Sequence, residues 1–178
     1  TYSLSSCHSS STSNNDADNI IPVSKTTPNT SLATAMDTTL AAYYQLKDAI
    51  TRADTAEANT TAITLQTTLD SIPLTQIKND TVVSFAKATI SSMAGEILGL
   101  QGEADIQGKL SEFSMISDML YELIKVVGLK NQTVYRYFCP MAFDNKGAYW
   151  LSNEKKINNP YYGRVMPDCG EVKETMKF

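Results

Sequence analysis

The sequence of 178 residues contains a single histidine, His8, and this residue lies in a serine-rich stretch near the start. Histidine is the commonest general base and the commonest metal ligand of proteins. Its absence from the rest of the chain excludes Ser-His-Asp, Cys-His and His-Glu-x-x-His chemistry from the folded part. Glycine-rich phosphate loops are missing too, and the carboxylates are scattered. We therefore expect a protein that is not an enzyme.

Basic residues are also few. The chain has 15 Lys and Arg but 19 Asp and Glu, which gives a net charge of -4 and a pI near 5.0. No basic stripe is present to neutralise phosphates, so nucleic acid is not an expected partner. No apolar run approaches the roughly 20 residues that span a bilayer. The composition, 42% hydrophobic and 19% charged, predicts one soluble domain with appendages.

Near the start, Leu4-Ser5-Ser6-Cys7 resembles a bacterial lipobox, whose cysteine is acylated and becomes the mature N-terminus. Only three residues precede it, so we expect the chain to begin inside a truncated signal peptide. Residues 1–30 are then a truncated lipoprotein signal followed by a polar, disordered tether. This interpretation predicts lipidation at Cys7, contact with the membrane through that anchor only, and a place in the periplasm or at the cell surface. A chance occurrence in a low-complexity leader is the alternative.

Residues 31–129 show a helical apolar period and predict four helices joined by short links. Asp54, with Glu57 three residues later, looks like the N-cap of the second helix. Thr75 or Asp80 is expected to open the third helix. The fourth helix should begin at Asp105 and stop before Gly128. Short links predict an antiparallel up-down bundle. On the third helix, the predicted core residues are Ile77, Phe85, Ile90, Met93, Ile97 and Leu100.

Residues 130–178 lose this period and form a separate C-terminal unit in the prediction. Segments 133–138 and 148–151 have the composition of short strands, with a turn at 144–147 between them. Loops punctuated by proline and glycine follow. The expected fold is therefore mainly α, a four-helix bundle with a small irregular β-hairpin unit packed on it.

The C-terminal unit holds two sulfur-bearing pairs, Cys139 with Met141 and Met166 with Cys169. Residues two apart on an extended segment point to one face, and a turn lets residues three apart reach one centre. Thiolate and thioether together select Cu(I) over harder ions. A closed site of four such ligands suits a carrier, because no position is left open for a substrate. In this interpretation the four residues bind Cu(I).

A disulfide between Cys139 and Cys169 is the alternative. If Cys7 is acylated, these two form an even pair in an oxidising compartment. Closing a loop of ~30 residues would stabilise the unit by roughly 3–4 kcal/mol. The protein would then be a non-enzymatic interaction module of the cell envelope. Trp150, Tyr161 and Tyr162 could form its partner surface, or they could be the core of the unit. An oxidised pair supplies no thiolate, so the two interpretations exclude each other.

Several segments in order resemble a bacterial domain-of-unknown-function family. They are Ala42-Tyr43-Tyr-Gln-Leu-Lys-Asp-Ala49, Cys139-Pro-Met-Ala, Gly147-Ala-Tyr-Trp-Leu-Ser152, Ile157-Asn-Asn-Pro-Tyr-Tyr-Gly163 and Val165-Met-Pro-Asp-Cys-Gly170. The resemblance covers residues 31–176. That family occurs as stand-alone exported proteins and at the C-terminus of periplasmic adaptor subunits of copper and silver efflux. The resemblance implies a role in metal efflux, with an adaptor or another envelope protein as partner, and it implies no catalytic residues.

Overall fold

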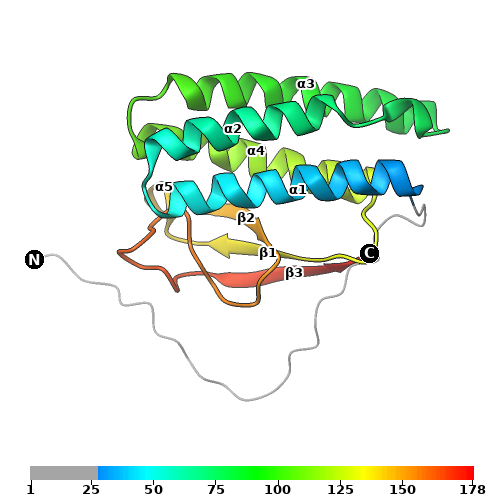
Figure 1. The fold of residues 1–178 in the computed structure, drawn as a ribbon. Coiled ribbons are helices and arrows are strands. Elements are labelled where there is room, and N and C mark those ends of the chain that lie inside the picture. Colours follow the sequence, from blue (N-terminus) through cyan, green and yellow to red (C-terminus); the bar gives the residue numbers. More distant parts are fainter. Residues whose placement is uncertain (1–27) are drawn as a thin grey trace, which may run out of the picture.

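The computed structural model describes residues 28–178, and four long helices dominate it. They are α1 (Thr30–Thr51), α2 (Thr55–Asp70), α3 (Asp80–Gly102) and α4 (Ile106–Val127), with a short 3-10 turn, η1 (Leu74–Gln76), between α2 and α3. The helices pack pairwise into a bundle, α1 with α2 and α3 with α4 (Figure 1). The predicted mainly helical fold is confirmed.

Side-chain caps fix where these helices begin. The carboxylate of Asp54 accepts the N–H of Glu57, and that of Asp105 accepts the N–H of Gly108. Both caps follow the sequence prediction. The cap of α3 is Asn79, whose side chain accepts the N–H groups of the first helical turn. Of the two expected starts, Asp80 is confirmed, since it is the first residue of α3, and Thr75 is wrong, because that residue lies in η1.

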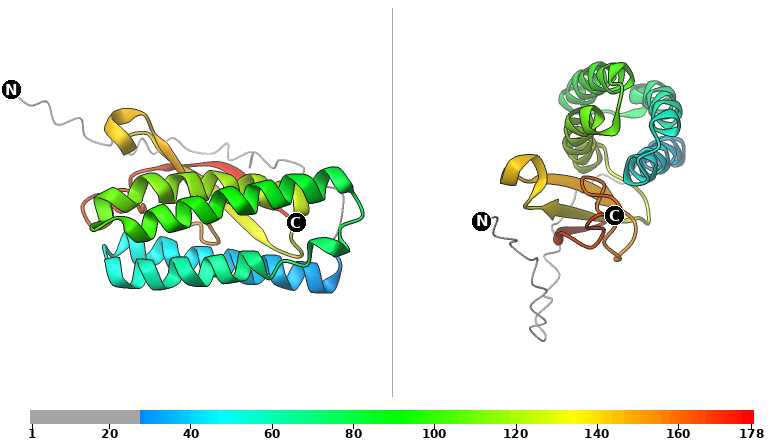
Figure 2. Two further views of the ribbon diagram at one scale, coloured as in Figure 1. Left: turned by 90° about the horizontal axis from the view of Figure 1, so that it is seen from above. Right: turned by 90° about the vertical axis from the view of Figure 1, so that its left-hand side faces the viewer.

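The apolar stripe of α1 forms the centre of the core. Leu32, Met36, Leu40, Tyr43, Leu46 and Ile50 are all buried. On α3 the prediction is partly wrong, since Phe85 is 37% exposed and Ala86 is buried in its place. Only four residues of α3 are buried: Ala86, Met93, Ile97 and Leu100. The helix lies at the side of the bundle far from the sheet (Figure 2). A narrow stripe of buried side chains is therefore enough to pack it against the other helices.

A buried lysine joins the ends of three helices. The ammonium group of Lys109 donates to the carbonyls of Leu100 and Glu103 at the end of α3, at 2.6 and 2.7 Å. It also donates to the side-chain oxygen of Asn59 on α2, at 2.8 Å. Burial lowers the pKa of Lys109. The lysine therefore satisfies helix-terminal carbonyls that would otherwise lie unpaired inside the protein.

Residues 133–177 form a three-stranded antiparallel sheet of β1 (Thr133–Cys139), β2 (Ala148–Ser152) and β3 (Glu171–Lys177), in the order β2-β1-β3. A one-turn helix, α5 (Ala142–Asn145), lies in the connection between β1 and β2. The sequence predicted the first two strands only. β3 was missed because four of its seven residues are charged, which is the composition of an edge strand rather than of a core strand.

The sheet lies under the bundle, against α1 and α4 (Figures 1 and 2). Tyr43 of α1 is the central link. Its hydroxyl accepts the backbone N–H of Leu151 in β2 at 3.1 Å and donates to the Ser117 hydroxyl of α4 at 2.7 Å. Within residues 28–178, no helix has the length and apolar character needed to cross a membrane.

Candidate functional site

Both cysteines of the C-terminal unit lie at the same end of the sheet. Cys139 is the last residue of β1, and it is fully buried because β2 and β3 flank that strand. Phe138 pairs with Glu171, so the antiparallel register continued by one residue sets Cys139 opposite Gly170. Cys169 immediately precedes that glycine and is 6% exposed. In the part of the chain that the structure describes, no disulfide joins the two cysteines.

The structure brings two of the four predicted sulfur ligands into direct contact. The thiol of Cys169 donates a hydrogen bond to the thioether of Met141, with the sulfur atoms 3.7 Å apart. Met166 lies in the turn that leads to Cys169, and its carbonyl accepts the N–H of Cys169 at 3.3 Å. Both methionines are half-buried and pack against the core. The sulfur contact therefore joins Met141 and Cys169, while Cys139 ends β1 and Met166 is linked to Cys169 through its backbone carbonyl.

Two residues of the long loop before β3 hold this arrangement. Asn159 is fully buried, and its side-chain N–H donates to the carbonyl of Cys169 at 2.6 Å while its side-chain oxygen accepts the N–H of Tyr161 at 2.8 Å. Tyr162 donates its hydroxyl to the carbonyl of Met141 at 2.8 Å. Sequence reasoning treated Asn159 as a turn residue and missed this role. The buried side-chain amide of Asn159 fixes the positions of both partners, because leaving their backbone groups unpaired inside the protein would cost free energy.

The aromatic residues of the unit form a core rather than an exposed surface. Trp150 is fully buried and stacks on Tyr137, with ring centroids 5.1 Å apart. Tyr161 is 6% exposed, meets Trp150 edge-on and reaches Phe113 of α4. The alternative of a partner surface is therefore wrong for Trp150 and Tyr161, since their rings are covered. Tyr162 is half-buried.

Burial sets the ionisation of these rings. Removal from water raises the pKa of Tyr161 well above its ordinary value, and nearby charge, that of Cys139 included, adds to the shift. Burial likewise raises the pKa of Tyr137 to about 12. Both rings therefore stay neutral at ordinary pH.

The turn after Cys139 has an unusual backbone. Phe143, Asp144 and Asn145 follow one another at φ values of 52°, 56° and 66°, in the left-handed region. Such conformations cost roughly 1–2 kcal/mol for a residue with a side chain. Gly147 closes the turn at φ 81°, where a Cβ atom would collide with the ring of Phe138. Local strain therefore lies directly beside the sulfur residues.

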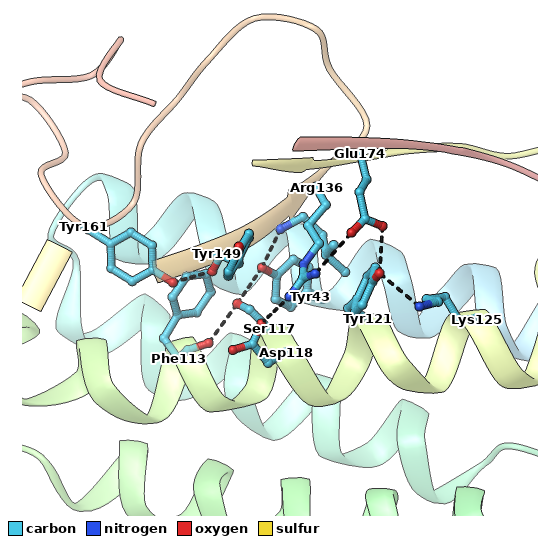
Figure 3. A network of polar contacts seen from close by, with 11 residues as sticks. Tyr43, Phe113, Ser117, Asp118, Tyr121, Lys125, Arg136, Tyr149, Tyr161 and Glu174 are labelled. Carbon is cyan, nitrogen blue, oxygen red and sulfur yellow. Dashed lines mark hydrogen bonds and ion pairs between the residues drawn. The ribbon is translucent and has the colours of Figure 1, made fainter. Parts of the chain in front are cut away.

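A separate polar network fastens the sheet to α4 (Figure 3). The guanidinium group of Arg136 lies between the rings of Tyr121 and Tyr149, 3.8 and 3.9 Å from their centroids. Arg136 also forms ion pairs with Asp118 at 3.0 Å and Glu174 at 3.3 Å. Burial alone would lower the pKa of Arg136, but the hydrogen bond to Asp118 and the surrounding charges raise it overall. The network serves as a structural link, although the buried Nε atom of Arg136 has no hydrogen-bond partner among the described residues.

No group of three or more His, Cys, Asp or Glu side chains comes together within residues 28–178 in a way that could hold a metal ion. Cys7, the predicted lipidation site, lies outside the described residues.

The family model that matches the chain is that of DUF3347, described as a protein of unknown function, and the match covers residues 39–132. It covers the bundle from within α1 to the end of α4 and stops directly before β1, so the sulfur residues lie beyond it. No curated protein and no solved structure is significantly similar to the chain. Because the match covers more than half of the sequence, the chain belongs to the DUF3347 family of proteins of unknown function.

Proposed function

We propose that Cys139, Met141, Met166 and Cys169 bind a soft metal ion, Cu(I), and that the protein captures this ion and hands it over without bond-breaking chemistry. One observation carries the proposal: the sulfur atoms of Met141 and Cys169, 28 residues apart in the sequence, lie 3.7 Å from each other. Cys139 ends the neighbouring strand, and Met166 lies in the turn before Cys169.

The chemical type of the donor atoms determines which metal ion the site would prefer. Thiolate and thioether ligands favour Cu(I), whereas carboxylate, carbonyl and imidazole ligands favour harder ions. Binding would release the thiol protons of Cys139 and Cys169, so the affinity should rise with pH. Burial of both cysteines keeps water from competing for the ion.

The cellular setting is part of the same proposal. The Leu4-Ser5-Ser6-Cys7 segment supports an exported lipoprotein anchored at Cys7. The resemblance to domains attached to copper and silver efflux adaptors supports such an adaptor, or another envelope protein, as the partner that delivers or receives the ion.

An anaerobic titration of the reduced protein with Cu(I) against a competing chelator tests the proposal. The wild type should bind one Cu(I), and the Cys139→Ser/Cys169→Ser variant should compete far less well. Met141→Leu should weaken binding, while Met115→Leu serves as the matched control, because Met115 is 51% exposed on α4. Equal affinity of the wild type and the double serine variant would end the proposal.

Intact mass before and after thiol alkylation tests the disulfide alternative. A protein prepared without reductant that lacks two protons and takes no label at Cys139 and Cys169 would carry a disulfide. Such a protein would be the interaction module instead of the carrier.

A further inference from the structure

We propose that the turn 141–147 is a movable arm through which the ion enters and leaves the sulfur site. The inference rests on the proposed function for the identity of the ion. The arm itself is argued from the structure of the turn, and its opening can be measured without metal.

Access requires that some segment moves, because the thiols are covered. Cys139 is fully buried and Cys169 is 6% exposed. Cys139 ends the central strand and pairs with Ala148 of β2, so its displacement would disturb the sheet. Cys169 is fixed through its carbonyl by the buried side chain of Asn159. Of the segments that carry the sulfur residues, the turn that bears Met141 is the one that can open at the lowest cost.

The backbone of the turn lowers that cost. Phe143, Asp144 and Asn145 are in the left-handed region, and a residue that leaves this region regains roughly 1–2 kcal/mol. Strain of this kind is typical of segments that switch between two conformations. Asp144, Asn145 and Lys146 are exposed, so within residues 28–178 no segment packs over the outer side of the turn. Local opening is therefore favoured here over the rest of the sheet.

A hydrogen bond that closes the turn, and a cleft, both lie beside residues 141–147. The hydroxyl of Tyr162 donates to the carbonyl of Met141 at 2.8 Å and holds the turn closed. A cleft of about 270 Å³ lies beside the turn, lined by Gln107, Leu110, Ala142, Phe143, Asp144, Tyr161 and Tyr162. Opening would break the hydrogen bond to Tyr162 and withdraw the Met141 sulfur from Cys169. The thiols would then be reachable from this cleft.

The rate of alkylation of Cys139 and Cys169 in the native, reduced, metal-free protein measures the opening. Peptide mapping by mass spectrometry follows these two thiols separately from Cys7. Tyr162→Phe removes the hydrogen bond to the Met141 carbonyl and should speed the alkylation of both thiols by roughly fivefold. Asp144→Gly relieves the left-handed strain of the closed turn and should slow it by roughly fivefold.

Two controls separate strain from charge and position. Asp144→Asn removes the charge but keeps a residue that tolerates the left-handed region. Lys146→Gly places glycine elsewhere in the same turn, at φ -76°. The backbone there is outside the left-handed region, so glycine has no strain to relieve. Neither control should slow alkylation. The inference is overturned if Tyr162→Phe and Asp144→Gly react at the wild-type rate, if Lys146→Gly slows the reaction as much as Asp144→Gly, or if the wild-type thiols react as fast as in the unfolded chain.

Release of Cu(I) to an excess of chelator should follow the same order, fastest in Tyr162→Phe and slowest in Asp144→Gly. A wild type that binds no Cu(I) refutes the proposed function while the alkylation rates still decide whether the arm exists. A wild type that binds Cu(I) and releases it at one rate in all variants refutes the arm and leaves the function standing.

Discussion

The bundle and the sheet of this protein are held together by different means. In the bundle, aliphatic side chains at helical spacing fill the core, and most contacts join helices that are neighbours in the sequence. In the sheet, stacked rings and sulfur atoms fill a small core, and polar contacts close long loops. The bundle is therefore built on a regular apolar period, while the C-terminal sheet unit contains the strained turn and the candidate ligands.

Truncation of the largest ring in the sheet should have the largest effect on stability. Trp150→Ala removes a fully buried indole and should cost roughly 3–5 kcal/mol of unfolding free energy. Leu65→Ala is the counterpart in the bundle and should cost roughly 2–5 kcal/mol. Denaturant titration followed by circular dichroism measures both. A loss below 1 kcal/mol for Trp150→Ala would show that the rings of the sheet do not form a packed core.

The link between the two regions can be cut by removing one oxygen atom. Tyr43→Phe keeps the ring stacked on Phe113 but leaves the buried N–H of Leu151 without its acceptor. The expected cost is roughly 1–3 kcal/mol. Amide exchange of Leu151 should become faster, while that of the α1–α2 pair should change less. Unchanged exchange at Leu151 would contradict the role of Tyr43 as the central link.

High pH should destabilise the protein through its buried phenols. The pKa of Tyr137 is raised from 10.0 to about 12 in the folded protein, so the unfolded chain loses that proton first. The contribution is complete below pH 10 and is lost as the pH rises towards 12. Burial raises the pKa of Tyr43 and Tyr161 in the same direction. Stability measured from pH 8 to 11.5 should fall above pH 10, and less steeply in Tyr137→Phe.

The smallest effect is expected on the outer side of the bundle. Leu98 on α3 is 72% exposed, so Leu98→Gln should change the unfolding free energy by no more than about 0.5 kcal/mol. Thermal unfolding of the wild type and the variant measures this change. A loss above 1 kcal/mol would mean that α3 packs more tightly than its exposure indicates.

The sequence predicted the bundle well, because its signals are local. Asp54 and Asp105 act as caps within three residues of their partners, and the stripe of α1 consists of six residues spaced by three or four. The prediction was only partly right on α3, where small residues share the helix with apolar ones, so that two faces have similar apolar character. Ala86 is buried there in place of Phe85. Local composition cannot reveal which face a neighbouring helix covers.

The sheet was harder to predict, because its contacts join distant residues. β3 is stabilised by pairing with β1, and its own sequence is too charged to signal a strand. Asn159 gains its positioning role through Cys169, ten residues away. The left-handed turn at Phe143–Asn145 carries no glycine at these three positions, so composition gave no sign of it. The sulfur pairs were visible as a pattern, but the contact of Met141 with Cys169 needed the fold.

The most direct test of the account is X-ray absorption at the copper edge of the protein loaded anaerobically with one Cu(I). The account predicts a first shell of sulfur alone, which loses one scatterer in Met141→Leu and collapses in Cys139→Ser/Cys169→Ser. A shell of nitrogen or oxygen ligands, or the same sulfur shell in Met141→Leu, would contradict the site formed at the end of β1.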